Sequence, residues 1–111
     1  MPHIDEDNLR LSYTNGIQIR RFDTHGLSTM KAVDFIAECE GETYFIELKD
    51  PDSPGATTEQ RDAFEERLSN KSLHEDLKYK YRDTFLYEWA CGNLKQTIHY
   101  YVIINMNELS T

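Results

Sequence analysis

The sequence predicts a mixed α+β fold of the α/β layer type, with a β-sheet of about five strands flanked by helices. Short segments with alternating apolar side chains come first, two helical segments follow, and one more strand-like segment comes last. A strand that follows a long helix can pair in parallel with the strand before the helices. We expect residues 1–111 to form one domain, which is a minimal version of its fold, a fragment of a longer protein or one module of a larger assembly.

The charge balance restricts the classes of function. The formal net charge is −8, whereas proteins that bind nucleic acid over their whole surface are usually basic. Nucleic-acid binding would therefore need a local basic patch, another domain or a partner. No apolar run approaches the roughly 20 residues that cross a bilayer, and no signal peptide is visible. We expect a cytoplasmic protein that does not bind membranes and keeps Cys39 and Cys91 reduced.

The N-terminal segment predicts a β-hairpin over residues 8–22. Apolar and polar side chains alternate on both sides of Asn15-Gly16, and Asn-Gly is the strongest signal for a two-residue type I′ turn. Residues 23–29 are small, polar and interrupted by Gly26, so we expect a loop there.

Two further strands are predicted over residues 30–39 and 42–49, joined by a tight turn at Glu40-Gly41-Glu42. Both carry apolar side chains on their two faces, which indicates central strands that are covered on both sides. The stretch from Asp50 to Gly55 contains two prolines and ends the second of these strands.

Two helices follow. Thr57 or Thr58 can cap a first helix that starts at Glu59. The pair Ser72 and Glu75 has the spacing of a capping box for a second helix. This helix is expected to end near Ala90 and to bury an apolar stripe with a spacing of four residues: Leu73, Leu77, Tyr81, Phe85 and Trp89, with Leu86 beside them. Residues 97–106 predict a last strand, apolar on both faces and therefore also central.

The predicted central hairpin gathers charge on one face. Side chains alternate along a strand, so Asp34 lies on one face of its strand while Glu47 and Lys49 share a face of the next. Two carboxylates on adjacent strands can bind a hard cation such as Mg²⁺ or Mn²⁺. An ammonium group beside them can orient a water molecule or stabilise charge on a phosphoryl group, as metal-assisted phosphodiester hydrolysis requires.

This pattern, Asp34 followed after twelve residues by Glu47-Leu48-Lys49 and then by helix and strand, resembles the PD-(D/E)XK nuclease superfamily. The resemblance covers about residues 30–106 and implies a restriction-endonuclease-like fold. It implies that Asp34, Glu47 and the Leu48 carbonyl bind Mg²⁺ or Mn²⁺, and that Asp34, Glu47 and Lys49 are catalytic. The expected activity is hydrolysis of phosphodiester bonds in nucleic acid, with DNA favoured. Members usually open with a helix that often carries another acidic ligand, a role that Asp5, Glu6 or Asp7 could take here.

Other interpretations remain open at this point. The three charged residues could form a salt bridge on a solvated sheet face, or the chain could be a catalytically inactive nuclease-fold module that serves in binding or assembly. A small acidic domain could act as a homodimer or with a partner protein. The basic group of the second helix could contact phosphate or face solvent, and its aromatic residues could stack on bases or fill the core. These residues are Lys78, Lys80 and Arg82, and Tyr79, Tyr81 and Trp89.

Overall fold

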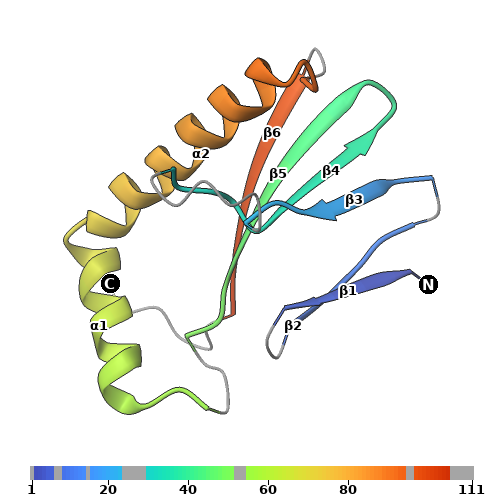
Figure 1. Ribbon diagram of the computed structural model, residues 1–111. Helices are drawn as coiled ribbons and strands as arrows, with labels where there is room; N and C mark the ends of the chain where they lie inside the picture. The colour runs from blue at the N-terminus through green and yellow to red at the C-terminus, as the bar shows by residue number, and fades with distance from the viewer. Residues whose placement is uncertain are drawn as a thin grey trace.

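The computed structural model describes residues 2–6, 9–14, 16–23, 30–51, 55–94 and 97–105. These residues form a mixed α+β fold, as predicted (Figure 1). Within them no helix is long and apolar enough to span a membrane. The elements are β1 (His3–Glu6), β2 (Leu9–Ser12), β3 (Gln18–Arg21), β4 (Phe35–Cys39), β5 (Glu42–Lys49), α1 (Thr58–Ser69), α2 (Ser72–Ala90) and β6 (Thr97–Ile104).

The six strands form two sheets. One is the two-stranded hairpin β1–β2, and the other has four strands in the order β3-β4-β5-β6. The pairs β3–β4 and β4–β5 are antiparallel, whereas β5 and β6 are parallel and are connected through α1 and α2. The predicted parallel pairing of the last strand with the strand before the helices is therefore confirmed. The prediction had one sheet of about five strands, whereas the structure has a four-stranded sheet and a separate two-stranded hairpin.

The central hairpin β4–β5 turns over two residues. Glu40 and Gly41 both have positive φ angles, 49° and 81°, as a type I′ turn requires. The predicted bounds of β5 are confirmed. The strand β4 is shorter than predicted, because it begins at Phe35 and not at Met30. Asp34 therefore lies just outside the ladder, and its carbonyl accepts a hydrogen bond from the Phe22 N–H beyond the end of β3.

The prediction of one hairpin over residues 8–22 is wrong. The strand β2 pairs with β1, whereas β3 leaves it and pairs with β4. The Ile17 N–H donates to the Thr14 carbonyl over 3.4 Å, so the chain does turn here. Packing of the two segments on the central sheet competes with their pairing. The predicted turn residue Asn15, the loop residues 24–29 and residues 52–54 of the proline-rich break lie outside the described residues.

Both faces of β4 and β5 are covered, as expected for central strands. On one face α2 packs on a cluster that includes Val33, Ile36 and Phe45. On the other face the β1–β2 hairpin contributes Ile4 and Leu11 to a second cluster. The hairpin and α2 lie on opposite sides of the sheet in Figure 1. The sheet is thus flanked by α2 on one face and by the β1–β2 hairpin on the other.

The two helices start differently. Thr57, one of the two predicted caps, caps α1 by a capping box with Gln60, and the helix begins at Thr58, one residue before the predicted start. The predicted Ser72–Glu75 box is wrong, since the N-cap residue of α2 is Lys71 and its side chain makes no capping hydrogen bond. Instead Lys71, with φ 67°, reverses the chain, and the Asn70 side chain accepts from the Ser72 N–H over 2.9 Å.

The buried side of α2 agrees with the predicted stripe only in part. Leu73 is buried, and Tyr81 and Phe85 pack on the core cluster, but Leu86 and Trp89 are 49% and 68% exposed. A spacing of four residues drifts by about 40° per step on a helix of 3.6 residues per turn, so Trp89 is carried away from the side of Leu73. A series of α2 side chains on the side of the sheet follows the 3.6-residue repeat more closely than a spacing of four does. It consists of Leu73, Leu77, Lys80, Thr84 and Glu88, and the last three are polar.

The strand β6 is not central. It pairs with β5 on one side and lies at the edge of the four-stranded sheet among the described residues. Its sequence nevertheless has no charged residue and no proline, which is typical of an interior strand.

Candidate active site

Asp34 lies at the entrance to β4, opposite Glu47 of β5. The ladder pairs Phe35 with Ile46, so continuing the register by one residue sets Asp34 across from Glu47. The Asp34 N–H donates to Glu47 Oε1 over 3.2 Å, and the Leu48 N–H donates to Asp34 Oδ2 over 2.8 Å. The two predicted carboxylates are thus fixed beside each other by backbone hydrogen bonds across the hairpin.

Glu47 is held by two lysines. Its side chain is 1% exposed, and Lys49 Nζ lies 3.2 Å from its Oε2. The Lys80 ammonium, from α2, contacts the same oxygen. A buried carboxylate needs such partners because removal of its charge from water is costly. The predicted association of Glu47 with Lys49 is present, and a second cation joins it.

Lys49 also lies on the wall of a cleft beside the end of β5. The cleft is bounded by the start of α1, and its lining includes Lys49, Asp50, Gln60 and Phe64. Asp50 Oδ1 accepts from the Asn105 side chain over 2.6 Å, whereas its Oδ2 is buried without a partner among the described residues. Lys49 therefore links the interior carboxylate to a hollow in the surface.

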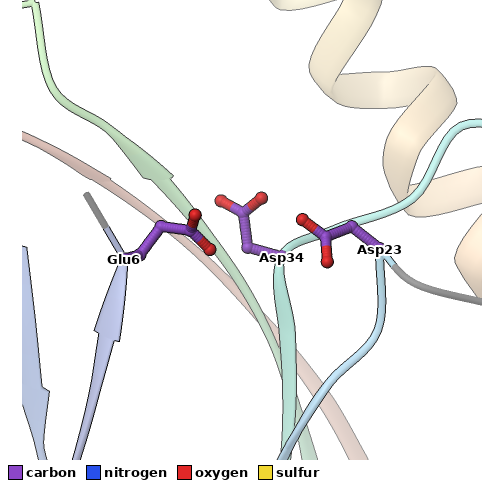
Figure 2. Close-up of side chains that lie close together, drawn as sticks. All are labelled: Glu6, Asp23 and Asp34. Carbon is purple, nitrogen blue, oxygen red and sulfur yellow. The ribbon is translucent and has the colours of Figure 1, made fainter.

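Three carboxylates converge on the open side of Asp34. One oxygen each of Glu6, Asp23 and Asp34 lie within 4.8 Å of one another. Figure 2 shows the three side chains pointing toward a common point from β1, from the end of β3 and from the start of β4. Glu6 is oriented by Arg21, whose guanidinium donates to it over 2.7 Å.

The surroundings of Asp34 disfavour its charge. Burial of the carboxyl raises the pKa of Asp34 to about 6, and the Glu47 carboxylate adds to this effect. The hydrogen bond from Leu48 and the charge of Lys80 act in the opposite direction. For Lys80, burial lowers the pKa, but contact with Glu47 outweighs it and holds the pKa above the ordinary value. Asp34 thus carries a charge that the site compensates incompletely.

No protein-family model, curated protein sequence or solved structure matches this chain.

The donor chemistry around Asp34 fits a hard cation. Glu6, Asp23 and Asp34 offer oxygen ligands, which Mg²⁺ and Mn²⁺ prefer. Both oxygens of Glu47 have hydrogen-bonding or ionic partners, so a metal at Oε2 would compete with Lys49 and Lys80. Leu48 contributes its N–H to Asp34, and the ligand role expected for its carbonyl stays a prediction.

The sequence does not predict two members of this site. It predicts a loop at Asp23, because the pairing that brings the end of β3 to Asp34 has no local signal. In this pairing the Phe22 N–H donates to the Asp34 carbonyl over 2.9 Å. By proximity in sequence, Lys80 groups with Lys78 and Arg82. Its position three residues after Leu77 and four before Thr84, on the side of α2 that faces the sheet, was the available signal.

The other basic residues lie elsewhere. Lys78 is exposed and pairs with Glu75 over 3.5 Å. Arg82 contacts Asp83 and lies over the Tyr79 ring at 4.6 Å from its centroid. Of the aromatic residues, Tyr81 packs in the core while Tyr79 and Trp89 are exposed.

Proposed function

We propose that the chain is a Mg²⁺- or Mn²⁺-dependent nuclease that hydrolyses phosphodiester bonds of DNA. The observation that carries the proposal is the fixed pair of Asp34 and Glu47 on adjacent strands, with Lys49 two residues further along β5. This is the arrangement that the resemblance to PD-(D/E)XK nucleases implies. The parallel pairing of β5 with the strand that follows the helices supports the same reading.

Each residue has a role in this proposal. Asp34 would hold the cation, with Glu6 and Asp23 beside it in the role that the resemblance gives to an acidic residue of an opening helix. A bound divalent cation polarises a phosphoryl oxygen and lowers the pKa of a bound water. Lys49, at the wall of the cleft, would orient the attacking water or contact the phosphate. Lys80 would hold Glu47 in place from α2.

A second candidate belongs to another class. The net charge of −8 and the engagement of Glu47 by two lysines favour a module that keeps the nuclease fold and acts in binding or assembly. The two candidates differ in whether a cation enters at Asp34 and whether cleavage follows.

Metal binding is tested first. Titration calorimetry with Mn²⁺ and with Mg²⁺ is expected to give a binding heat for the wild type that is lost in Asp34→Asn and reduced in Glu47→Gln. Glu59→Gln, at the exposed start of α1, serves as the matched control and should bind as the wild type does. A wild type without any heat that depends on Asp34 would overturn the proposal.

Cleavage is tested next. Single- and double-stranded DNA and RNA are incubated with the protein and Mn²⁺, and cleavage of DNA is expected to disappear in Lys49→Ala and Glu47→Gln but to persist in Lys78→Ala. Metal binding without cleavage of any of these substrates would reject the nuclease and select the non-catalytic module.

A further inference from the structure

The strand β6 has an unpaired backbone edge among the described residues. The Asn105 N–H donates to the Lys49 carbonyl over 2.8 Å, which shows that odd-numbered residues of this strand direct their backbone groups toward β5. Backbone groups alternate in direction along a strand, so Ile98, Tyr100, Val102 and Ile104 direct theirs away from the sheet. Each offers one N–H and one C=O, since none is proline.

This edge lacks the features that normally prevent pairing. Natural edge strands are short, or carry lysine, proline or a bulge. The strand β6 has eight residues, Thr97–Ile104, and its side chains are uncharged apart from His99, which can be protonated. Its composition predicts an interior strand, yet its position in this chain is at an edge.

Both faces of β6 are also incompletely covered. On the face opposite α2, Tyr101 and Ile103 are 50% and 43% exposed. On the α2 face a groove separates the helix from the strand and is lined mainly by apolar atoms. Its residues are His74, Leu77, Lys78, Tyr81, Tyr100 and Val102. A neighbouring strand and the layers that accompany it would cover all three surfaces together.

We propose that a second copy of this chain pairs with β6, antiparallel and about a two-fold axis, so that two four-stranded sheets join into one. The net charge of −8 opposes contact between copies over most of the surface, and β6 is a segment without acidic side chains. A two-fold contact uses the same edge twice and closes after two copies.

The backbone directions fix the register. Only residues that point outward can exchange hydrogen bonds, so even-numbered residues pair with even-numbered residues. Placing Tyr101 on the axis pairs Tyr100 with the partner's Val102 and Ile98 with the partner's Ile104. All outward-directed groups of the strand are then bonded. Tyr101 then lies opposite the partner's Tyr101 as a non-hydrogen-bonded pair. Such aromatic cross-strand contacts stabilise antiparallel ladders.

The first experiment measures association. Sedimentation equilibrium of the wild type is expected to show a monomer–dimer equilibrium that shifts toward dimer as salt screens the acidic charge. Tyr101→Lys places like charges opposite each other and should raise the dissociation constant at least about tenfold. The control Trp89→Lys, on the exposed side of α2, should leave it unchanged. Circular dichroism checks that both variants fold.

The second experiment tests the register. In a chain with Cys39→Ser and Cys91→Ser, Tyr101→Cys should form an intermolecular disulfide on mild oxidation, because paired Cα atoms at this position lie about 4.5 Å apart. Ile103→Cys should not, since the two copies of residue 103 would be about 13 Å apart. A wild type that stays monomeric at millimolar concentration overturns the proposal. So does a dimer that Trp89→Lys disrupts and Tyr101→Lys does not, or one in which Ile103→Cys cross-links faster than Tyr101→Cys.

Discussion

Lys80 of α2 and Glu47 of β5 form an ion pair at the centre of the candidate site, and this pair joins the helix to the sheet. The Glu47 side chain is 1% exposed and that of Lys80 is 18% exposed, so solvent screens the pair only weakly. Further along the same side of α2, Thr84 bonds the Val33 backbone and Glu88 contacts Arg20 of β3. The helix is thus attached to the sheet by polar contacts as well as by its apolar cluster.

Removal of the Lys80 charge should destabilise the fold. Lys80→Met keeps most of the side-chain volume but leaves Glu47 with Lys49 as its remaining cation, and loss of one partner from a buried pair typically costs about 3–5 kcal/mol. Because Lys49 stays, we expect a loss of about 2 kcal/mol in the free energy of unfolding, measured by urea denaturation.

Two controls accompany this variant. Lys78→Met, on the exposed side of α2, should change stability by less than about 0.5 kcal/mol. In the double variant with Glu47→Gln, the cost of Lys80→Met should shrink, since the charge that Lys80 compensates is gone. Equal losses for Lys78→Met and Lys80→Met would contradict the ion pair.

Thr84 should be required for its hydroxyl and not for its shape. It is fully buried, and its Oγ1 accepts from the Val33 N–H over 3.2 Å. Thr84→Val has nearly the same volume but leaves that N–H without a partner, at a cost of about 1–3 kcal/mol. Thr84→Ser keeps the hydroxyl and should lose less than Thr84→Val in the same urea experiment. The reverse order would show that the methyl contacts dominate.

The elements that could be predicted are those with strong local signals. The turn at Glu40 and Gly41, the strand Glu42–Lys49 and the helix cap at Thr57 all follow from nearby residues. The pairing of the N-terminal strands depends on which segment packs better on Phe35 and Ile46, which is a non-local choice. The Asn-Gly signal is compatible with a turn in either arrangement, so it could not decide between them.

Of the candidate site, the sequence predicts only the residues that lie close together along the chain. Asp34, Glu47 and Lys49 lie on one hairpin, so alternation along two strands was enough to place them together. Glu6, Asp23 and Lys80 reach the site from a separate hairpin, from the end of β3 and from α2. Their approach depends on how three layers pack. The predicted apolar stripe on α2 also has a spacing of four residues, which drifts around the helix and does not identify Lys80 as a residue that faces the sheet.

The raised pKa of Asp34 predicts a dependence of stability on pH. The folded-state pKa, about 6, lies above the ordinary value of 3.8, so the folded protein holds a proton that the unfolded chain has released. The stabilisation is complete below pH 3.8 and is lost as the pH rises through about 6. Asp34→Asn keeps an oxygen that accepts from Leu48 but carries no charge.

In buffer with a chelator, Asp34→Asn should therefore gain stability relative to the wild type by about 1–2 kcal/mol between roughly pH 4 and pH 8, a value reduced for partial exposure. Thermal melts across this range measure the difference. The control Asp62→Asn, at an exposed position of α1, should show a smaller change. A constant difference between Asp34→Asn and the wild type would show that Asp34 titrates as it does in the unfolded chain.

Addition of a divalent cation should raise the free energy of unfolding, because it removes the repulsion among the three carboxylates of the site. Glu6, Asp23 and Asp34 repel one another when all three are ionised, and a bound cation replaces this repulsion with attraction. At a concentration of Mg²⁺ or Mn²⁺ about 100 times the dissociation constant, the fold should gain about 2.7 kcal/mol, seen as a rise in Tm. Chelation should return Tm to its starting value. Glu6→Gln and Asp23→Asn should each reduce the gain, and Glu59→Gln should preserve it. If Glu6→Gln and Asp23→Asn gain as much as the wild type while Asp34→Asn gains nothing, the cation is held on the Glu47 side of Asp34, because Glu47 is the nearest remaining carboxylate across the hairpin.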